Sequence, residues 1–297
     1  MSATRVNPYP LPDLLAALEQ VQAREQNDAT EIATGSSINF PSDDPTGAAQ
    51  LSELTDESTQ VDSFQQSVGS VNSLLSTADS TLNSVIAALQ TAITAGTEGA
   101  NGTLSDSDRA NVAAQVRGIQ SQLLSLANTS YQGQYIFAGT ANVQPFVADA
   151  NSPSSVTYNG NADSNEVTIG NGYQLQVNLP GSQIFTAAGG NVFQSIQDLI
   201  TALENNTNIG NAVTEVDNAY NSVNAQRVFY GNGISQLTSQ STYLNTEKLD
   251  LTQQANTVGG ADLAAVASQL ANDETALNAT VEAIAKIPQN SLFDYLK

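Results

Sequence analysis

One stretch of the sequence, residues 261–297, constrains the fold more than any other. After Gly259-Gly260, no glycine or proline occurs until Pro288. Apolar residues recur there at every seventh position, namely Leu263, Leu270, Leu277 and Ile284, and the alternate positions are Ala267, Glu274 and Val281. This pattern predicts a helix about 40 Å long over residues 261–287, with a narrow apolar seam along one side. Because so narrow a seam cannot bury itself, the helix requires a partner helix.

The opposite end of the sequence offers that partner. Its apolar residues also follow near-heptad spacing: Leu11, Leu14, Leu18, Val21 and Ile32. Glu25 and Asp28 interrupt this second seam. Prolines at positions 8, 10 and 12 predict that the helix begins only at Asp13, and Gly35 ends it. We therefore expect a terminal coiled-coil domain made from residues 1–45 and 256–297, with both ends disordered in the monomer.

The middle of the sequence contains longer ladders of the same kind. Residues at sevens run along two stretches: Leu54, Val61, Val68, Leu75, Leu82 and Leu89 in the first, and Val216, Val223, Tyr230, Leu237, Leu244, Leu251 and Val258 in the second. Such ladders are typical of coiled coils. Ser105 and Asp108 form a predicted capping box at the start of a further helix. Gly231 and Gly233, inside the second ladder, predict a bend or a close helix contact. We predict a helical bundle domain from residues 46–137 and 189–255.

The hydrophobic period changes to two between these helical parts. Tyr173, Leu175, Val177 and Leu179 alternate with polar residues after Asn171-Gly172, which is a strong hairpin signal. We expect residues 138–188 to form a small inserted β-rich domain. The predicted fold class is therefore mainly α: a long antiparallel helical bundle or coiled coil built from both chain ends, with one small β-rich insertion.

Composition excludes several classes of function. The 29 acidic and 8 basic residues give a net charge of −21, which argues against nucleic acid or an anionic membrane surface as a partner. The sequence has no Cys and no His, so thiolate nucleophiles, imidazole bases and the common zinc sites are excluded. No apolar run approaches the ~18 residues of a membrane span, and no conventional signal peptide is evident. We predict no cofactor and no metal site.

Paired carboxylates and clustered aromatic residues have two interpretations each. Asp43-Asp44 and Asp273-Glu274 allow a glycosidase or metal site in principle, but adjacent residues on a helix do not face each other. We interpret the first pair as capping groups of a turn-rich corner and Glu274 as a polar core position that sets register. Tyr135 and Phe137 could form a ligand platform, although aromatic residues at such a junction are usually core. The sequence thus favours a protein that is not an enzyme.

Two segments resemble a known family. Residues 31–49 carry an "IATG…PSDDP…AA" pattern, and residues 128–140 carry a "Y-I-F-A-G-T" pattern. The matching positions are Ile32, Gly35, Asp43, Asp44 and Pro45 in the first segment and Tyr135, Phe137, Gly139 and Thr140 in the second. Both resemble the flagellin superfamily, and the second resembles its branch of hook-filament junction proteins, hook-associated protein 3. The ending at residues 291–296 is similar to that branch as well.

The resemblance implies a structural part of the bacterial flagellum that adapts the hook to the filament. It implies export in an unfolded state through the flagellar type III apparatus and an extracellular location at the hook-filament junction. It also implies a ring of identical subunits, with the first hook-associated protein, flagellin and an export chaperone as partners. Our hypothesis is that the two terminal seams assemble these subunits through Leu14, Leu18, Val21, Leu263, Leu270, Leu277, Val281, Ile284, Leu292, Phe293 and Leu296.

Three alternatives remain open at this point. Within the same family, the chain could be a flagellin, which differs in its copy number per filament. A surface adhesin would not depend on flagellar export. A polysaccharide-acting enzyme on a helical stalk would need converging acidic residues in the insertion, whose only acids are Asp149, Asp163 and Glu166.

Overall fold

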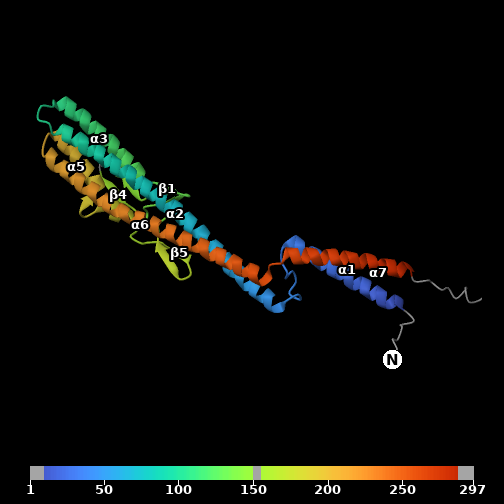
Figure 1. The fold of residues 1–297 in the computed structure, drawn as a ribbon. Coiled ribbons are helices and arrows are strands. Elements are labelled where there is room, and N and C mark those ends of the chain that lie inside the picture. The colour runs from blue at the N-terminus through green and yellow to red at the C-terminus, as the bar shows by residue number, and fades with distance from the viewer. Residues whose placement is uncertain (1–9, 150–154, 287–297) are drawn as a thin grey trace, which may run out of the picture. The chain divides into compact units, whose positions relative to one another are not determined.

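The computed structural model describes residues 10–149 and 155–286, and most of them are helical (Figure 1). It divides into two compact units, one formed by residues 1–60 with 247–297 and the other by residues 61–246. Two long helices, α2 (Pro45–Gly99) and α6 (Ile209–Gly259), contribute to both units. This mainly helical architecture, with helices from both chain ends and a small strand-containing part, confirms the predicted fold class. The three predicted domain boundaries stay a prediction.

The first unit pairs the two ends of the chain. Helix α1 (Pro10–Thr34) packs along α7 (Leu263–Lys286), and Figure 1 shows the two side by side. The expectation that prolines delay α1 until Asp13 is wrong, because the helix begins at Pro10 and contains Pro12. The reason is positional. Backbone N–H groups in the first turn have no partner within the helix, so a proline there removes no hydrogen bond.

The second unit is organised around α2 and α6. Its core takes the predicted heptad positions from both helices, and these side chains are buried: Val61, Val68, Leu75, Leu82 and Leu89 from α2, and Val216, Val223, Tyr230, Leu237 and Leu244 from α6. Arg227 of α6 reaches Asp79 of α2 through two hydrogen bonds of 2.6 and 3.0 Å. A two-pronged guanidinium–carboxylate contact fixes direction as well as distance, so it holds the two ladders at one register.

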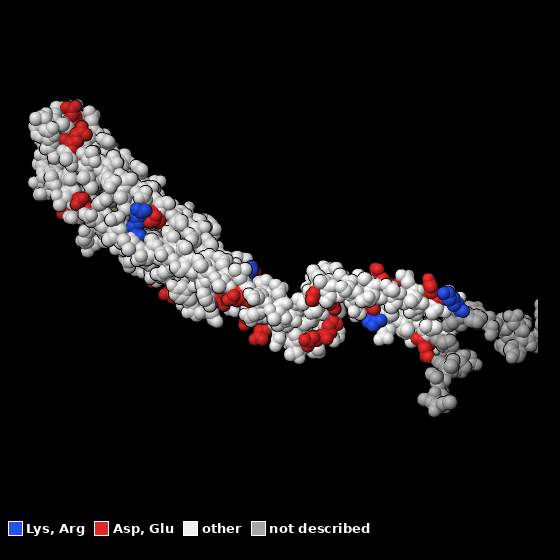
Figure 2. Space-filling view, in the orientation of Figure 1, with Lys and Arg blue, Asp and Glu red and all other residues white. Residues whose placement is uncertain are grey.

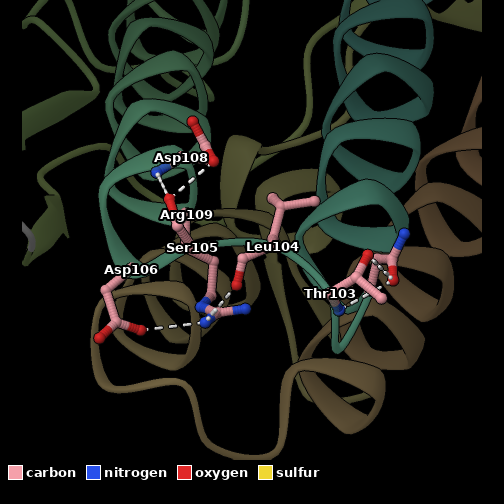
Figure 3. Close-up of polar contacts among 7 residues, drawn as sticks. Thr103, Leu104, Ser105, Asp106, Asp108 and Arg109 are labelled. Atoms are coloured by element: carbon pink, nitrogen blue, oxygen red, sulfur yellow. Dashed lines mark hydrogen bonds and ion pairs between the residues drawn. The ribbon is translucent and has the colours of Figure 1, made fainter.

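Helices α3 (Asp106–Ala127) and α5 (Val192–Asn205) pack on each other in the same unit. The predicted capping box at the start of α3 is confirmed in its first half, because Ser105 accepts a hydrogen bond from the backbone N–H of Asp108 at 3.2 Å. The carboxylate of Asp108 accepts from the hydroxyl of Ser105 at 2.6 Å and not from its backbone N–H. Figure 3 shows the neighbouring Arg109, whose buried guanidinium donates to the carbonyl of Leu104 and to Asp106. Acceptors that are close in sequence thus compensate for burying the guanidinium of Arg109.

Within the described residues, the strands form four separate two-stranded antiparallel sheets, and each pairs strands that are consecutive in sequence. They are β1 (Ser130–Tyr131) with β2 (Gln134–Tyr135), β3 (Phe146–Ala148) with β4 (Val156–Tyr158), β5 (Glu166–Gly170) with β6 (Tyr173–Gln176), and β7 (Thr186–Ala187) with β8 (Gly190–Asn191). The predicted hairpin at Asn171-Gly172 joins β5 to β6, and Gly172 has a φ of 69°. The predicted strand is shorter than expected, because β6 ends at Gln176.

A cluster of phenylalanine rings joins the insertion to the helices. Phe146 of β3 lies 5.2 Å from Phe185 of α4 (Gly181–Phe185) and 5.2 Å from Phe193 of α5, measured between ring centroids. Phe137 lies 5.2 Å from Phe185 as well. Ring pairs at this spacing add to the stabilisation that burial alone provides. Residues 138–188 therefore share a core with the surrounding helices.

Candidate functional site

The paired chain ends are the candidate site, because the seam hypothesis concerns them. On α1, Val21 is buried and Leu14 and Leu18 are half-buried. On α7, Leu270, Leu277 and Ile284 are half-buried. The structure thus brings these predicted residues together where α1 packs on α7. Their role in assembly stays a prediction.

Two of the predicted residues of α7 are exposed instead. Leu263 and Val281 are each 50% exposed, so the structure does not place these two predicted residues against α1. The interpretation of Glu274 as a polar core position is wrong, because Glu274 is exposed and its neighbour Asp273 is buried. Leu292, Phe293 and Leu296 lie outside the described residues. Leu11 and Leu15 of α1 are exposed apolar side chains as well. We call these four apolar residues, Leu11, Leu15, Leu263 and Val281, the outer row.

Charged groups interrupt the seam between the helices. Asp273 of α7 is only 3% exposed, and its Oδ1 lies 3.5 Å from Nη2 of Arg24 on α1. The other oxygen of Asp273 is buried without a hydrogen-bond partner, and so is Oδ2 of Asp28. Glu25 on the same face of α1 is half-buried. A buried carboxylate costs free energy unless it is paired, so this group weakens the pair that it interrupts. We call Arg24, Glu25, Asp28 and Asp273 the polar layer.

Sequence reasoning missed the pairing of Arg24 with Asp273. A signal was present, because Arg24 is the only basic residue between Arg5 and Arg109. A single arginine on a seam that also carries acidic residues indicates a partner carboxylate on the facing helix.

Backbone hydrogen bonds join the two helices at one end. The N–H of Ser37 donates to the carbonyl of Gly259 at 2.8 Å, and that of Ala261 donates to the carbonyl of Gly35 at 3.0 Å. Ser36 forms an antiparallel bridge with Gly260, and its hydroxyl donates to Gly259 at 3.0 Å. We call this group the clasp. It joins the end of α1 to the start of α7, so the two helices run antiparallel.

The acidic pair of the first motif serves the backbone. Oδ2 of Asp43 accepts from the N–H groups of Asn39 and Phe40 at 3.0 and 2.8 Å. Oδ1 of Asp44 accepts from the N–H of Thr46 at 3.0 Å, and Pro45 is the first residue of α2. Both carboxylates thus stabilise a turn and a helix start, which is the structural role that capping predicts. Ile32, also of this motif, is 37% exposed near the end of α1.

The second motif is a structural corner of the other unit. Phe137 is fully buried in the ring cluster, while Tyr135 is half-buried at the edge of a 960 Å³ cavity. Gly139 has a φ of 75° and lies so close to Asn161 that a Cβ there would clash with it. Asn161 also accepts from the N–H of Thr140 at 2.8 Å. These contacts give the motif a folding role.

The described residues offer few groups for catalysis. Within residues 10–149 and 155–286, no three His, Cys, Asp or Glu side chains lie close enough together to hold a metal ion. Asp163 accepts a hydrogen bond from Asn161, and Glu166 is exposed on β5. No helix among the same residues is long and apolar enough to cross a membrane. On the visible face, charged groups are sparse and mostly acidic (Figure 2).

Comparisons with known proteins agree with this architecture. A family described as the bacterial flagellin N-terminal helical region matches residues 12–142. Flagellar hook-associated protein 3 of Escherichia coli strain K12 is 28% identical over 303 residues, covering 93% of this chain and 94% of that protein. The chain is thus similar to proteins of the flagellin superfamily.

Other flagellar proteins are similar over a smaller share of the chain. The flagellin of Listeria innocua is 24% identical over 243 residues, which covers 80% of this chain and 79% of that protein. Among solved structures, a putative flagellar hook-associated protein from Vibrio parahaemolyticus covers 73% of this chain with a TM-score of 0.68 and 22% identity. That likeness supports the fold.

Proposed function

We propose that this protein is the structural adapter between the hook and the filament of a bacterial flagellum. The observation that carries the proposal is the similarity to hook-associated protein 3 of Escherichia coli, which extends over nearly the full length of both chains. This similarity covers 93% of this chain, whereas that to the flagellin of Listeria innocua covers 80%. The protein accordingly acts outside the cell, at the hook-filament junction.

The paired chain ends supply the assembly surface of this adapter. The outer row leaves four large apolar side chains partly exposed on one helix pair: Leu11 and Leu15 on α1, and Leu263 and Val281 on α7. Apolar side chains that are exposed in the single chain become buried when a neighbouring copy covers them. A neighbouring copy of the same chain covers this row, and repetition around the axis closes a ring.

The expected partners follow from the position of the protein in the flagellum. The first hook-associated protein lies below the ring, flagellin lies above it, and a chaperone accompanies the chain before export. No Cys occurs in the sequence, so no disulfide can prevent the chain from passing through an export channel in an unfolded state. The protein carries no catalytic role in this proposal.

A flagellin is the second candidate, because the Listeria innocua protein is similar over 80% of this chain. The two candidates differ in where the protein is found. An adapter occupies one short zone at the end of each hook, whereas a filament subunit occurs along the whole filament.

Immunogold electron microscopy of purified filaments attached to hook-basal bodies tests the proposal. We expect label at one zone between hook and filament, and label along the filament would contradict the adapter role. A deletion strain provides the second measurement. It should build hooks without filaments and release flagellin monomers into the medium, and complementation with the intact gene should restore filaments.

A further inference from the structure

The polar layer lowers the stability of the helix pair that contains it. Asp273 is buried, and one of its oxygens has no hydrogen-bond partner. Its other oxygen contacts Arg24 at 3.5 Å. An apolar residue at position 273 would complete the seam. A polar group in an otherwise apolar seam often determines which helix can pair with which, at a cost in stability.

The geometry of the pair determines which charges meet. The clasp places Ser36 opposite Gly260, and the ion pair places Arg24 opposite Asp273. Because the helices are antiparallel with the same rise, each step along α1 matches a step back along α7. This register puts Glu25 at the level of Asp273. The remaining basic group on α7, Lys286, contacts Glu282 of its own helix at 3.7 Å.

We propose that the contact between Arg24 and Asp273 makes α1 select α7 in preference to a second copy of either helix. Two α7 helices from different subunits would bury Asp273 with no arginine beside it. Two parallel α1 helices would bring Glu25 and Asp28 close to their own copies, and like charges repel. Only the pairing of α1 with α7 supplies a guanidinium to the buried carboxylate, so the wrong pairings carry the larger penalty.

This selection deepens the proposed function. The outer row must accept a neighbouring subunit, whereas the inner seam must not. A chain whose apolar seams lacked the polar layer would expose two similar seams to every other copy. Partner choice within the chain thus leaves the outer row as the surface for other subunits.

The absence of cysteine from the chain makes a direct test possible. Ala17 and Thr280 are half-buried and lie at one level of the pair, one heptad away from Arg24 and Asp273. Thr280→Cys alone reports contacts between two α7 helices as a disulfide-linked dimer. Ala17→Cys together with Thr280→Cys reports pairing within one chain. The purified full chain is oxidised at fixed concentration, and the products are separated by non-reducing electrophoresis.

We expect the double-cysteine protein to form mainly the intramolecular disulfide. Adding Asp273→Leu to the Thr280→Cys protein should raise the fraction of linked dimer several-fold. Glu274→Leu is the matched control, because it removes the same charge from the exposed neighbouring position and should leave the dimer fraction unchanged. Equal dimer fractions for Asp273→Leu and Glu274→Leu would overturn the proposal.

Charge exchange keeps the proposal testable if Asp273→Leu disturbs the helix pair. Asp273→Arg alone opposes Arg24 and should also raise the linked dimer. Combining it with Arg24→Asp should return the dimer fraction to that of the parent protein, and failure of this rescue would contradict partner selection. The measurements use purified protein without other flagellar components. If the purified chain pairs selectively but the deletion strain builds normal hooks and filaments, the proposed function is refuted and partner selection is not.

Discussion

Gly233 of α6 lies directly against Leu75 of α2. A Cβ at position 233 would be 2.8 Å from Cδ1 of Leu75, which is closer than real side chains approach. Leu75 is fully buried in a close-packed core, so its side chain must move to admit a Cβ at position 233. The two long helices of the second unit therefore meet closely at this level because one of them lacks a side chain. Gly231, two positions earlier on the exposed side, has no neighbouring atom within 4 Å of its Cβ site.

This difference predicts opposite effects for two alanine substitutions in the same helix. Gly231→Ala should stabilise the protein by about 0.5–1 kcal/mol, because alanine is the better helix former. Gly233→Ala gains the same propensity but forces Leu75 to move, which costs about 1–3 kcal/mol. Thermal unfolding followed by circular dichroism should therefore give a higher melting temperature for Gly231→Ala than for Gly233→Ala. The reverse order would show that the helices are not in close contact here.

The outer row can be tested separately from the inner seam. Val281→Asp places a charge on an exposed position of α7, so the free energy of unfolding of the purified chain should change by no more than about 0.5 kcal/mol. In an assembled ring the same carboxylate would be buried without a partner, so filaments should be lost and flagellin should appear in the medium. Normal swimming of the strain would contradict the assembly role of the outer row. Leu277→Asp provides the comparison: a lower melting temperature for this variant alone would show that the half-buried seam is already closed in the monomer.

Alkaline pH should destabilise the protein through Tyr230. Burial raises the pKa of this hydroxyl above its ordinary value, and the backbone N–H of Leu179 donates to its oxygen at 3.3 Å. An unfolded tyrosine loses its proton near pH 10, whereas folded Tyr230 retains it to higher pH. The folded state then binds more protons, so stability from this group is present below pH 10 and falls above it by about 1.4 kcal/mol per pH unit. Melting temperatures from pH 8 to 11 measure this slope.

Tyrosine-to-phenylalanine variants identify the group responsible for that slope. Tyr230→Phe should flatten it, at a cost of about 1–3 kcal/mol at neutral pH because the N–H of Leu179 loses its acceptor. Tyr243→Phe alters an exposed tyrosine of the same helix and serves as the control. An unchanged slope in the Tyr230→Phe protein would assign the alkaline transition to another residue.

The ring cluster predicts that the insertion and the helices unfold together. Phe146→Leu removes contacts with Phe185 and Phe193 and should lower stability by about 1–3 kcal/mol in a single transition. The control is Val147→Ala on the same strand, whose side chain is exposed and whose loss should matter little. Calorimetry that resolves a separate, low-temperature transition for the variant would instead support an independent β-rich domain.

The heptad pattern predicted the long helices well because burial along a coiled coil repeats every seven residues. Leu75, Leu82 and Tyr230 are all buried where the ladders place them. The pattern could not predict the second row of α7 that faces α1. Positions 267, 274 and 281 and positions 266, 273 and 280 both alternate with the row through Leu270 and Leu277. A single helix does not distinguish these choices, since the ion pair with Arg24 determines which side faces inward.

Short motifs were predictable only where all the residues involved are close in sequence. The N-cap at Ser105 and the hairpin at Asn171-Gly172 were predictable because each depends on a few adjacent residues. The sharing of a core between the insertion and the helices was not, because Phe146 and Phe193 are separated by more than forty residues of sequence. The start of α1 was misjudged for another reason. Proline opposes a helix in its interior but suits its first turn.

The clasp also has a consequence for the order in which the chain can fold. The hydroxyl of Ser36 and the carbonyl of Gly259 are separated by 223 positions in sequence. A chain that emerges from its N-terminus therefore exposes α1 long before α7 exists to pair with it. Contacts between such distant segments form late and slowly. The α1–α7 pair can therefore form only when nearly the whole chain has emerged. A truncated product cannot present the paired surface that the next subunit would meet.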